Sequence, residues 1–212
     1  MAKEKKSTAY IADYRSLPLW KYLGVIMPIC REGGDPLTQQ VRIIGALNYM
    51  TEKQVLALPI PEYTRLAAEA KFLEQPCDAS RAGRIATHYR LGEWDLVPTK
   101  DYTKMTAGQF IDFQALAKDP EKNLVQLLSV FLVPAGHAYN EGYDIDAVQD
   151  AIGQMSVQDA MEVMAFFLGK SQELLRDSLS SLERAAKTKA EKTELKKMLT
   201  ALSRSAGDGS TT

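Results

Sequence analysis

One stretch of this chain, from Thr106 to Lys170, is denser in apolar residues than the rest and constrains the fold most. It opens with Thr106-Ala107-Gly108-Gln109, which has the form of a capping box. In that motif the threonine oxygen accepts from the amide three residues on, and the glutamine reaches back to the threonine amide. Large apolar side chains follow this start signal. The stretch therefore predicts several helices that share one hydrophobic core.

Two helices of this stretch carry most of the apolar residues. The first starts at Asp119-Pro120-Glu121 and is apolar on most of its circumference up to Leu132, with Pro134 expected to end it. Such a helix belongs at the centre of a fold or in an interface. The second is capped at Ser156-Val157-Gln158-Asp159, and its apolar stripe continues as far as Leu182. We expect the second helix to outrun the domain that it starts in.

The N-terminal third predicts a module of short helices. A start is expected at Ser16-Leu17-Pro18, with Pro28 ending that helix. Asp35-Pro36 repeats the cap-then-proline signal, and Thr51-Glu52-Lys53-Gln54 is a second capping box. Short helices with small gaps suggest an orthogonal bundle over residues 16–75.

Between the two helical parts the pattern changes to a period of two residues. Ile85, Thr87, Tyr89 and Leu91 alternate with more polar positions, and a turn at Gly92 leads into a second alternating run. This predicts a β-hairpin over residues 84–98. Two strands are marginal on their own, so they must lie on the helices or add to the sheet of another chain.

The fold class predicted from these signals is mainly α. We expect a multi-helix bundle with a small β-hairpin between an N-terminal helical part and a C-terminal helical part that ends in a long helix. The expected segments are a flexible arm at 1–15, an N-terminal helical module at 16–75, the hairpin at 84–98, a C-terminal helical core at 104–182, a charged extended helix at 183–204 and a disordered tail at 205–212.

Composition narrows the class of protein. The sequence is 45% apolar and 25% charged with a net charge of −1, which gives no global attraction to nucleic acid or anionic lipid. Cys30 and Cys77 form no ligand motif, and two thiols favour a reducing compartment. No signal peptide and no run of about 18 apolar residues is visible, so neither secretion nor a membrane span is expected.

Motifs that carry chemistry are absent from the sequence. It contains no glycine-rich phosphate loop, nucleophile elbow or metal pair, so we expect no enzyme activity, no cofactor and no metal. His88 is read as a solvent-facing strand residue without a partner, and His137 has no neighbouring ligand. Oxygen ligands between Asn140 and Asp150 lack the spacing of an EF-hand, and Asp144 or Asp146 reads more simply as a helix cap.

The last helix is the best candidate for a surface that binds proteins. Two methionines and two phenylalanines occur within seven residues, and a leucine seam continues beyond them. They could offer an adaptable surface to the helix of a partner, or pack against the helix around Leu124–Leu132, which is the simpler interpretation. The candidate interaction residues are Met161, Met164, Phe166, Phe167, Leu175, Leu179, Leu182, Leu195 and Leu199.

Several segments together resemble a known class of proteins. They are Tyr89–Asp95, Met105–Gln114, Leu128–Pro134, Tyr139–Ile145 and Ala165–Leu168. The combination, over about residues 84–182, resembles proteins encoded in the tail modules of tailed phages and prophages. It is most similar to the tail or baseplate assembly-chaperone type.

The resemblance implies a bacteriophage virion assembly protein that is no enzyme. Its partners would be tail or baseplate proteins, with a homo-oligomer also open, and it would occur in the host cytoplasm during assembly or in the virion. It would act as a tail assembly chaperone or as a structural protein.

Two other functions follow from the residues. The short N-terminal helices and the basic run from Glu183 to Lys197 could belong to a helical regulator that binds DNA or RNA. In that case Glu52–Leu58 is the candidate reading helix, and it offers Lys53 and Gln54 to bases. An enzyme ranks last, because nothing in the sequence supplies its chemistry.

Overall fold

The computed structural model describes residues 11–78, 85–101 and 104–185, with backbone alone from 174 on. The described chain is mostly helical with one small antiparallel sheet, which confirms the predicted fold class. It divides into two units, residues 1–164 and 165–212. The first unit contains the predicted N-terminal module, the hairpin and most of the predicted C-terminal core. Within the described residues no helix is both long and apolar enough to cross a membrane.

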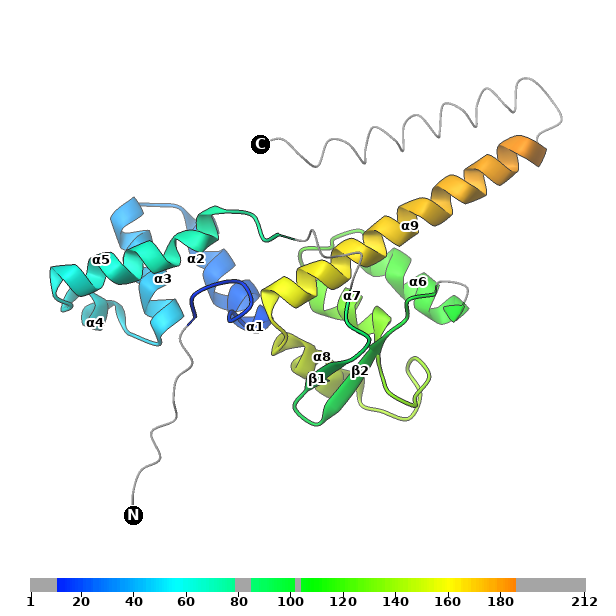
Figure 1. Ribbon diagram of the computed structural model, residues 1–212, viewed down its shortest axis with the longest axis horizontal. Helices are drawn as coiled ribbons and strands as arrows, with labels where there is room; N and C mark the ends of the chain where they lie inside the picture. The colour runs from blue at the N-terminus through cyan, green and yellow to red at the C-terminus, as the bar shows by residue number, and fades with distance from the viewer. Residues whose placement is uncertain (1–10, 79–84, 102–103, 186–212) are drawn as a thin grey trace, which may run out of the picture. The chain divides into compact units, whose positions relative to one another are not determined.

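A continuous helical segment opens the fold. It consists of α1 (Leu19–Lys21), a π-helical turn (Tyr22–Ile26) and α2 (Met27–Glu32) (Figure 1). Pro28 was expected to end this helix, and the structure shows that it does not. Proline lacks the N–H that an α-helix needs at this point, and the wider π turn just before it re-spaces the hydrogen bonds. The helix ends instead at Gly33, whose φ is +67°.

Residues 11–15, predicted to belong to a flexible arm, are packed in the fold. Ile11 is buried, and the hydroxyl of Tyr14 donates to the carbonyl of Gln75 at 2.8 Å. Ser16 does not cap the first helix, because its hydroxyl is held in a turn by Asp13. Instead the chain forms a short antiparallel bridge in which the amide of Leu19 donates to Met155 at 2.8 Å. The N-terminal segment is thereby joined to the C-terminal half.

Three helices pack around a small core of their own. They are α3 (Pro36–Asn48), α4 (Glu52–Leu56) and α5 (Ile60–Glu69), which a 3-10 turn follows at Ala70–Glu74. The caps predicted at Asp35 and Thr51 are both present, the latter as a complete capping box. Val41, Ile44, Val55 and Leu66 form the buried centre of this cluster.

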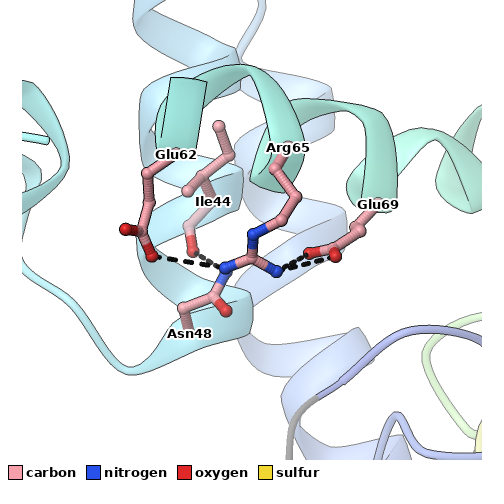
Figure 2. Close-up of polar contacts among 5 residues, drawn as sticks. All are labelled: Ile44, Asn48, Glu62, Arg65 and Glu69. Atoms are coloured by element: carbon pink, nitrogen blue, oxygen red, sulfur yellow. Dashed lines mark hydrogen bonds and ion pairs between the residues drawn. The ribbon is translucent and has the colours of Figure 1, made fainter. Parts of the chain in front are cut away.

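Polar contacts order the surface of the same cluster. Figure 2 shows Arg65 on α5 lying between Glu62 and Glu69, with nitrogen–oxygen distances of 3.3 and 2.8 Å. On α3, the side chain of Asn48 donates to the carbonyl of Ile44 at 2.9 Å. These exposed ion pairs contribute little free energy each, so the apolar centre must supply most of the stability.

The sheet contains the predicted hairpin and one strand more. β1 (Tyr89–Leu91) and β2 (Trp94–Pro98) pair through a two-residue turn, and β3 (Leu132–Pro134) pairs with the other side of β2. Residues 132–134 were expected to be the end of a helix. The partner that the hairpin needs therefore comes from the same chain. Tyr89, Leu96 and Pro134 form one buried row across the three strands.

Three helices complete the described part of the C-terminal half before the last one. α6 (Ala107–Leu116) has the predicted capping box at Thr106, and α8 (Ile145–Gly153) is capped by Asp144. α7 (Leu124–Phe131) starts later than Asp119 predicts, because residues 119–123 form turns. The last helix of the described residues, α9 (Val157–Ala185), has the predicted cap at Ser156, whose hydroxyl accepts from the amide of Asp159 at 3.0 Å. Beyond residue 185, the helix predicted to residue 204 and the tail predicted at 205–212 lie outside the described residues.

Lys21 is a buried cation without a hydrogen bond. It is 4% exposed, and its Nζ has no hydrogen-bond partner among the described residues. The Nζ lies 3.2 Å from the centroid of the Tyr49 ring, whose electrons attract a cation. Burial disfavours the charged form and lowers the pKa of Lys21 from 10.5 to about 8.

Replacing Lys21 with methionine is expected to stabilise the protein at pH 7. Between pH 8 and 10.5 the unfolded chain holds more protons on Lys21 than the folded protein does. The free-energy cost of burying the charged ammonium is therefore fully present below about pH 8 and disappears as the pH rises towards 10.5. We expect K21M to raise the free energy of unfolding by about 1–2 kcal/mol at pH 7, after allowing for the Tyr49 ring, with a smaller gain at pH 10. Urea titrations at the two pH values measure this difference. An equal gain at both pH values would show that the buried charge of Lys21 is not what destabilises the protein.

Gly45 is a second position where the structure predicts that a substitution changes the stability of the protein. A Cβ on Gly45 would lie 2.7 Å from the carbonyl oxygen of Met50, a backbone atom that cannot easily move. G45A is expected to lower the free energy of unfolding by about 1–3 kcal/mol. G24A is the matched control, since a Cβ there meets nothing within 4 Å. Thermal unfolding by circular dichroism compares the two, and equal midpoints would show that α3 can shift away from Met50.

Candidate functional site

A hollow of the first unit lies on the face of the sheet that carries Val97 and Val133. It has a volume of about 620 Å³, within the range of small-molecule sites. Val97 and Val133, which pair across β2 and β3, are part of its lining. The remaining lining comes from residues 87–88, 98–101, 104, 106, 109 and 134–139. Three separate parts of the chain therefore meet at this cavity.

Both histidines of the chain line this cavity, which the sequence did not indicate. His88 was expected to have no partner, and that expectation was wrong. Its Nδ1 lies 3.1 Å from both carboxylate oxygens of Asp95. The turn at Gly92-Glu93 places Arg90 opposite Asp95, so His88 is the diagonal neighbour of Asp95 on the same face. The register of the hairpin was the signal that could have found this pair.

His137 is placed by a tightly built loop between β3 and α8. Its Nδ1 lies 3.3 Å from the carbonyl oxygen of Glu141, and its ring meets Tyr143 edge-on at 5.8 Å. Gly142 has a φ of +77°, and a Cβ there would lie 3.1 Å from the imidazole. Gly136 and Asn140 are also left-handed. A loop held in this way at three positions fixes the imidazole beside the cavity.

Two lysines add positive charge to the rim. The Nζ of Lys100 donates to the carbonyl of Ile85 at 3.1 Å, which fixes the side chain while an ammonium has further N–H groups to offer. Lys104 is exposed at the same rim, and Asp101 is the acidic residue among the described lining. This arrangement can hold a negatively charged group. Within the described residues no three His, Cys, Asp or Glu side chains gather as a metal site would require.

Helix α6 connects the cavity to an exposed apolar surface. Thr106 and Gln109 line the cavity, while Phe110 and Ile111 are 52% and 64% exposed on the outside of the helix. Gln109 itself is buried, and its side chain donates to the carbonyl of Val130 at 3.0 Å. This bond to α7 fixes which side of α6 faces outwards.

The single charge of α6 is already engaged. Asp112 accepts from the hydroxyl of Tyr139 at 2.8 Å. Burial first, and then this carboxylate, raise the pKa of Tyr139 far above its ordinary value. A helix that is apolar around most of its circumference belongs in a core or an interface. The outer face of α6, namely Ala107, Phe110, Ile111, Gln114 and Ala115, therefore has the composition of an interface.

The structure places the interaction residues predicted on the last helix in three groups. Met164 and Phe167 are buried, at 5% and 0% exposure, so these two side chains are not presented to a partner. Met161 and Phe166 are partly exposed. For the leucines, the backbone alone is described at Leu175, Leu179 and Leu182, and Leu195 and Leu199 lie outside the described residues. The predicted partner surface stays a prediction for all except the two buried residues.

Comparison of the chain with known proteins gives no match to any protein-family model, curated protein or solved structure.

The Tyr139–Asp112 bond generates a prediction for the loop that borders the cavity. Y139F removes a hydrogen bond to a half-buried carboxylate and is expected to lower the free energy of unfolding by about 1–2 kcal/mol. Y49F is the control, because it keeps an exposed ring and should leave stability within about 0.5 kcal/mol. Urea unfolding measures both. If Y139F has the same free energy of unfolding as the wild type, water replaces the Tyr139 hydroxyl at Asp112 without loss of stability.

Proposed function

We propose that this protein is a non-enzymatic assembly factor that binds a virion tail or baseplate protein through the outer face of α6. The observation that carries the proposal is the exposure of Phe110 and Ile111 on a helix whose one charged residue is engaged by Tyr139. Removing such a surface from water against an apolar partner lowers the free energy of the complex. The tail-module class follows from the sequence resemblance over residues 84–182.

A second line of support is that the outer face of α6 exposes more apolar than polar side chains. Two large apolar residues stand next to each other there, whereas Leu37 on α3 is 60% exposed beside the polar Thr38 and Gln40. Single exposed apolar residues are ordinary on protein surfaces, whereas a large contiguous apolar patch marks an interaction site. The outer face of α6 fits a partner that offers an apolar helix or strand.

Charge in the N-terminal module also favours a protein partner over nucleic acid. Its three arginines, Arg31, Arg42 and Arg65, are each ion-paired with glutamate. Phosphate contacts are made chiefly by lysine and arginine, so these pairs would have to open before the arginines bound a backbone. The predicted reading helix α4 also begins with Glu52, which lies 3.7 Å from Arg42.

The test is to make the outer face of α6 polar and to measure binding of a tail component. We expect the F110S/I111S protein to lose at least tenfold in affinity for the tail or baseplate protein that co-purifies with the wild type. The partner is identified by mass spectrometry from phage-infected cells, then purified and titrated by calorimetry. L37S is the matched control and should bind as the wild type does.

Folding and binding can be told apart in this experiment. Both side chains of the double substitution lie on the surface, so the melting temperature should change little. A correctly folded F110S/I111S protein that binds the tail component with wild-type affinity would contradict the proposal. So would wild-type protein whose co-purifying partners include no virion component. Light scattering on the same samples shows whether a second copy of the chain occupies the face instead.

A further inference from the structure

The cavity on the sheet is lined by both basic and apolar side chains. Lys100, Lys104 and His137 are among its lining residues, and so are the paired valines Val97 and Val133. A volume of about 620 Å³ accommodates a small organic molecule. The protein-binding function proposed for α6 uses none of these groups.

Three basic side chains of the lining have contacts within the chain before any ligand arrives. Asp95 orients His88, Ile85 accepts from the ammonium of Lys100, and the left-handed Gly142 leaves room for His137. Prior fixation lowers the entropy cost of binding, since fewer side chains become ordered when the ligand enters.

The composition of the rim selects the class of ligand. Lysine donates hydrogen bonds to anionic oxygens, and Thr87, Thr99 and Thr106 add hydroxyl groups to the lining. The Nδ1 of His137 donates to the carbonyl of Glu141, so its other ring nitrogen donates to an anion only when both nitrogens carry protons. Asp101 is the opposing charge and restricts where an anionic group can sit. The two valines and the neighbouring prolines Pro98 and Pro134 favour an apolar or ring-bearing part on the same molecule.

We propose that this cavity binds a small organic anion. Its phosphate or carboxylate group contacts Lys100 and Lys104 next to His137, and its apolar part lies against Val97 and Val133. The protein therefore has a ligand site distinct from the outer face of α6, with Thr106 and Gln109 of that helix forming one wall.

The histidines provide a direct test. The chain contains two, and both line the cavity, so the imidazole region of a carbon–proton correlation spectrum of tag-free protein reports on this site. The probes are inorganic phosphate, phenyl phosphate, acetate and benzoate, each titrated at constant ionic strength against potassium chloride. We expect saturable shifts of the His137 signal with phosphate or acetate, and binding at least tenfold tighter for the corresponding ring-bearing anion.

Two variants assign the response to the rim. K100Q/K104Q should weaken binding at least tenfold, and K104Q alone should weaken it severalfold if the double variant does not fold. K71Q/K118Q is the matched control, since these exposed lysines lie outside the cavity, and it should bind as the wild type does.

Each outcome decides the matter. Shifts confined to phosphate or to acetate identify the acidic group and support the site. Linear shifts without saturation, equal affinities for the small and the ring-bearing anions, or an unchanged response in K104Q and K100Q/K104Q would each overturn it. Because F110S/I111S leaves the rim intact, it should bind these anions normally. Failure of the anion site thus leaves the protein-binding proposal standing, and the reverse also holds.

Discussion

Burial of a single apolar segment, α7 and the strand that directly follows it, is the constraint on which the C-terminal half depends. Leu127, Leu128, Phe131 and Leu132 are fully buried. α6 and α8 pack on α7, and β3 supplies the third strand of the sheet. Removal of this segment from water is the dominant favourable term in the folding of this half. The position of each neighbouring element is set by the part of the segment that it covers.

The buried polar side chains near this segment form hydrogen bonds within the described part of the chain. The side chain of Gln109 serves the capping box of α6 and also donates to Val130, so one residue both starts a helix and docks it. Ser129 is buried and donates to the carbonyl of Gln126 at 2.7 Å. Lys21 differs, because its buried ammonium meets an aromatic ring in place of an oxygen. Such a group is costly unless something compensates for its lost hydration.

The two proposed activities share α6 but use different chemistry. The inner side of the helix and its cap border the cavity, and the outer side carries Phe110 and Ile111. An anion in the cavity would touch Thr106 and Gln109, the residues that fix the start of the helix. Coupling between the two sites would require that each ligand bind two states of the protein with different affinities.

The sequence by itself determined the local structure of this protein. The caps at Asp35, Thr51, Thr106, Asp144 and Ser156 and the hairpin all follow from interactions within a few residues. The groups that make each of these caps are adjacent in the chain, so no distant residue is needed to complete them. The helix starts predicted at Ser16 and Asp119 were wrong, because the same side chains can also close a turn.

Tertiary structure decided everything that joins distant residues. The third strand, the bridge from Leu19 to Met155 and the meeting of His88 with His137 at one cavity all link positions that are far apart in the chain. The sequence pattern after Phe131 predicts a continuation of the helix. In the structure the backbone of residues 132–134 instead forms hydrogen bonds with the open edge of β2. Periodicity cannot reveal such choices, because they depend on which surface is left uncovered once the helices have packed.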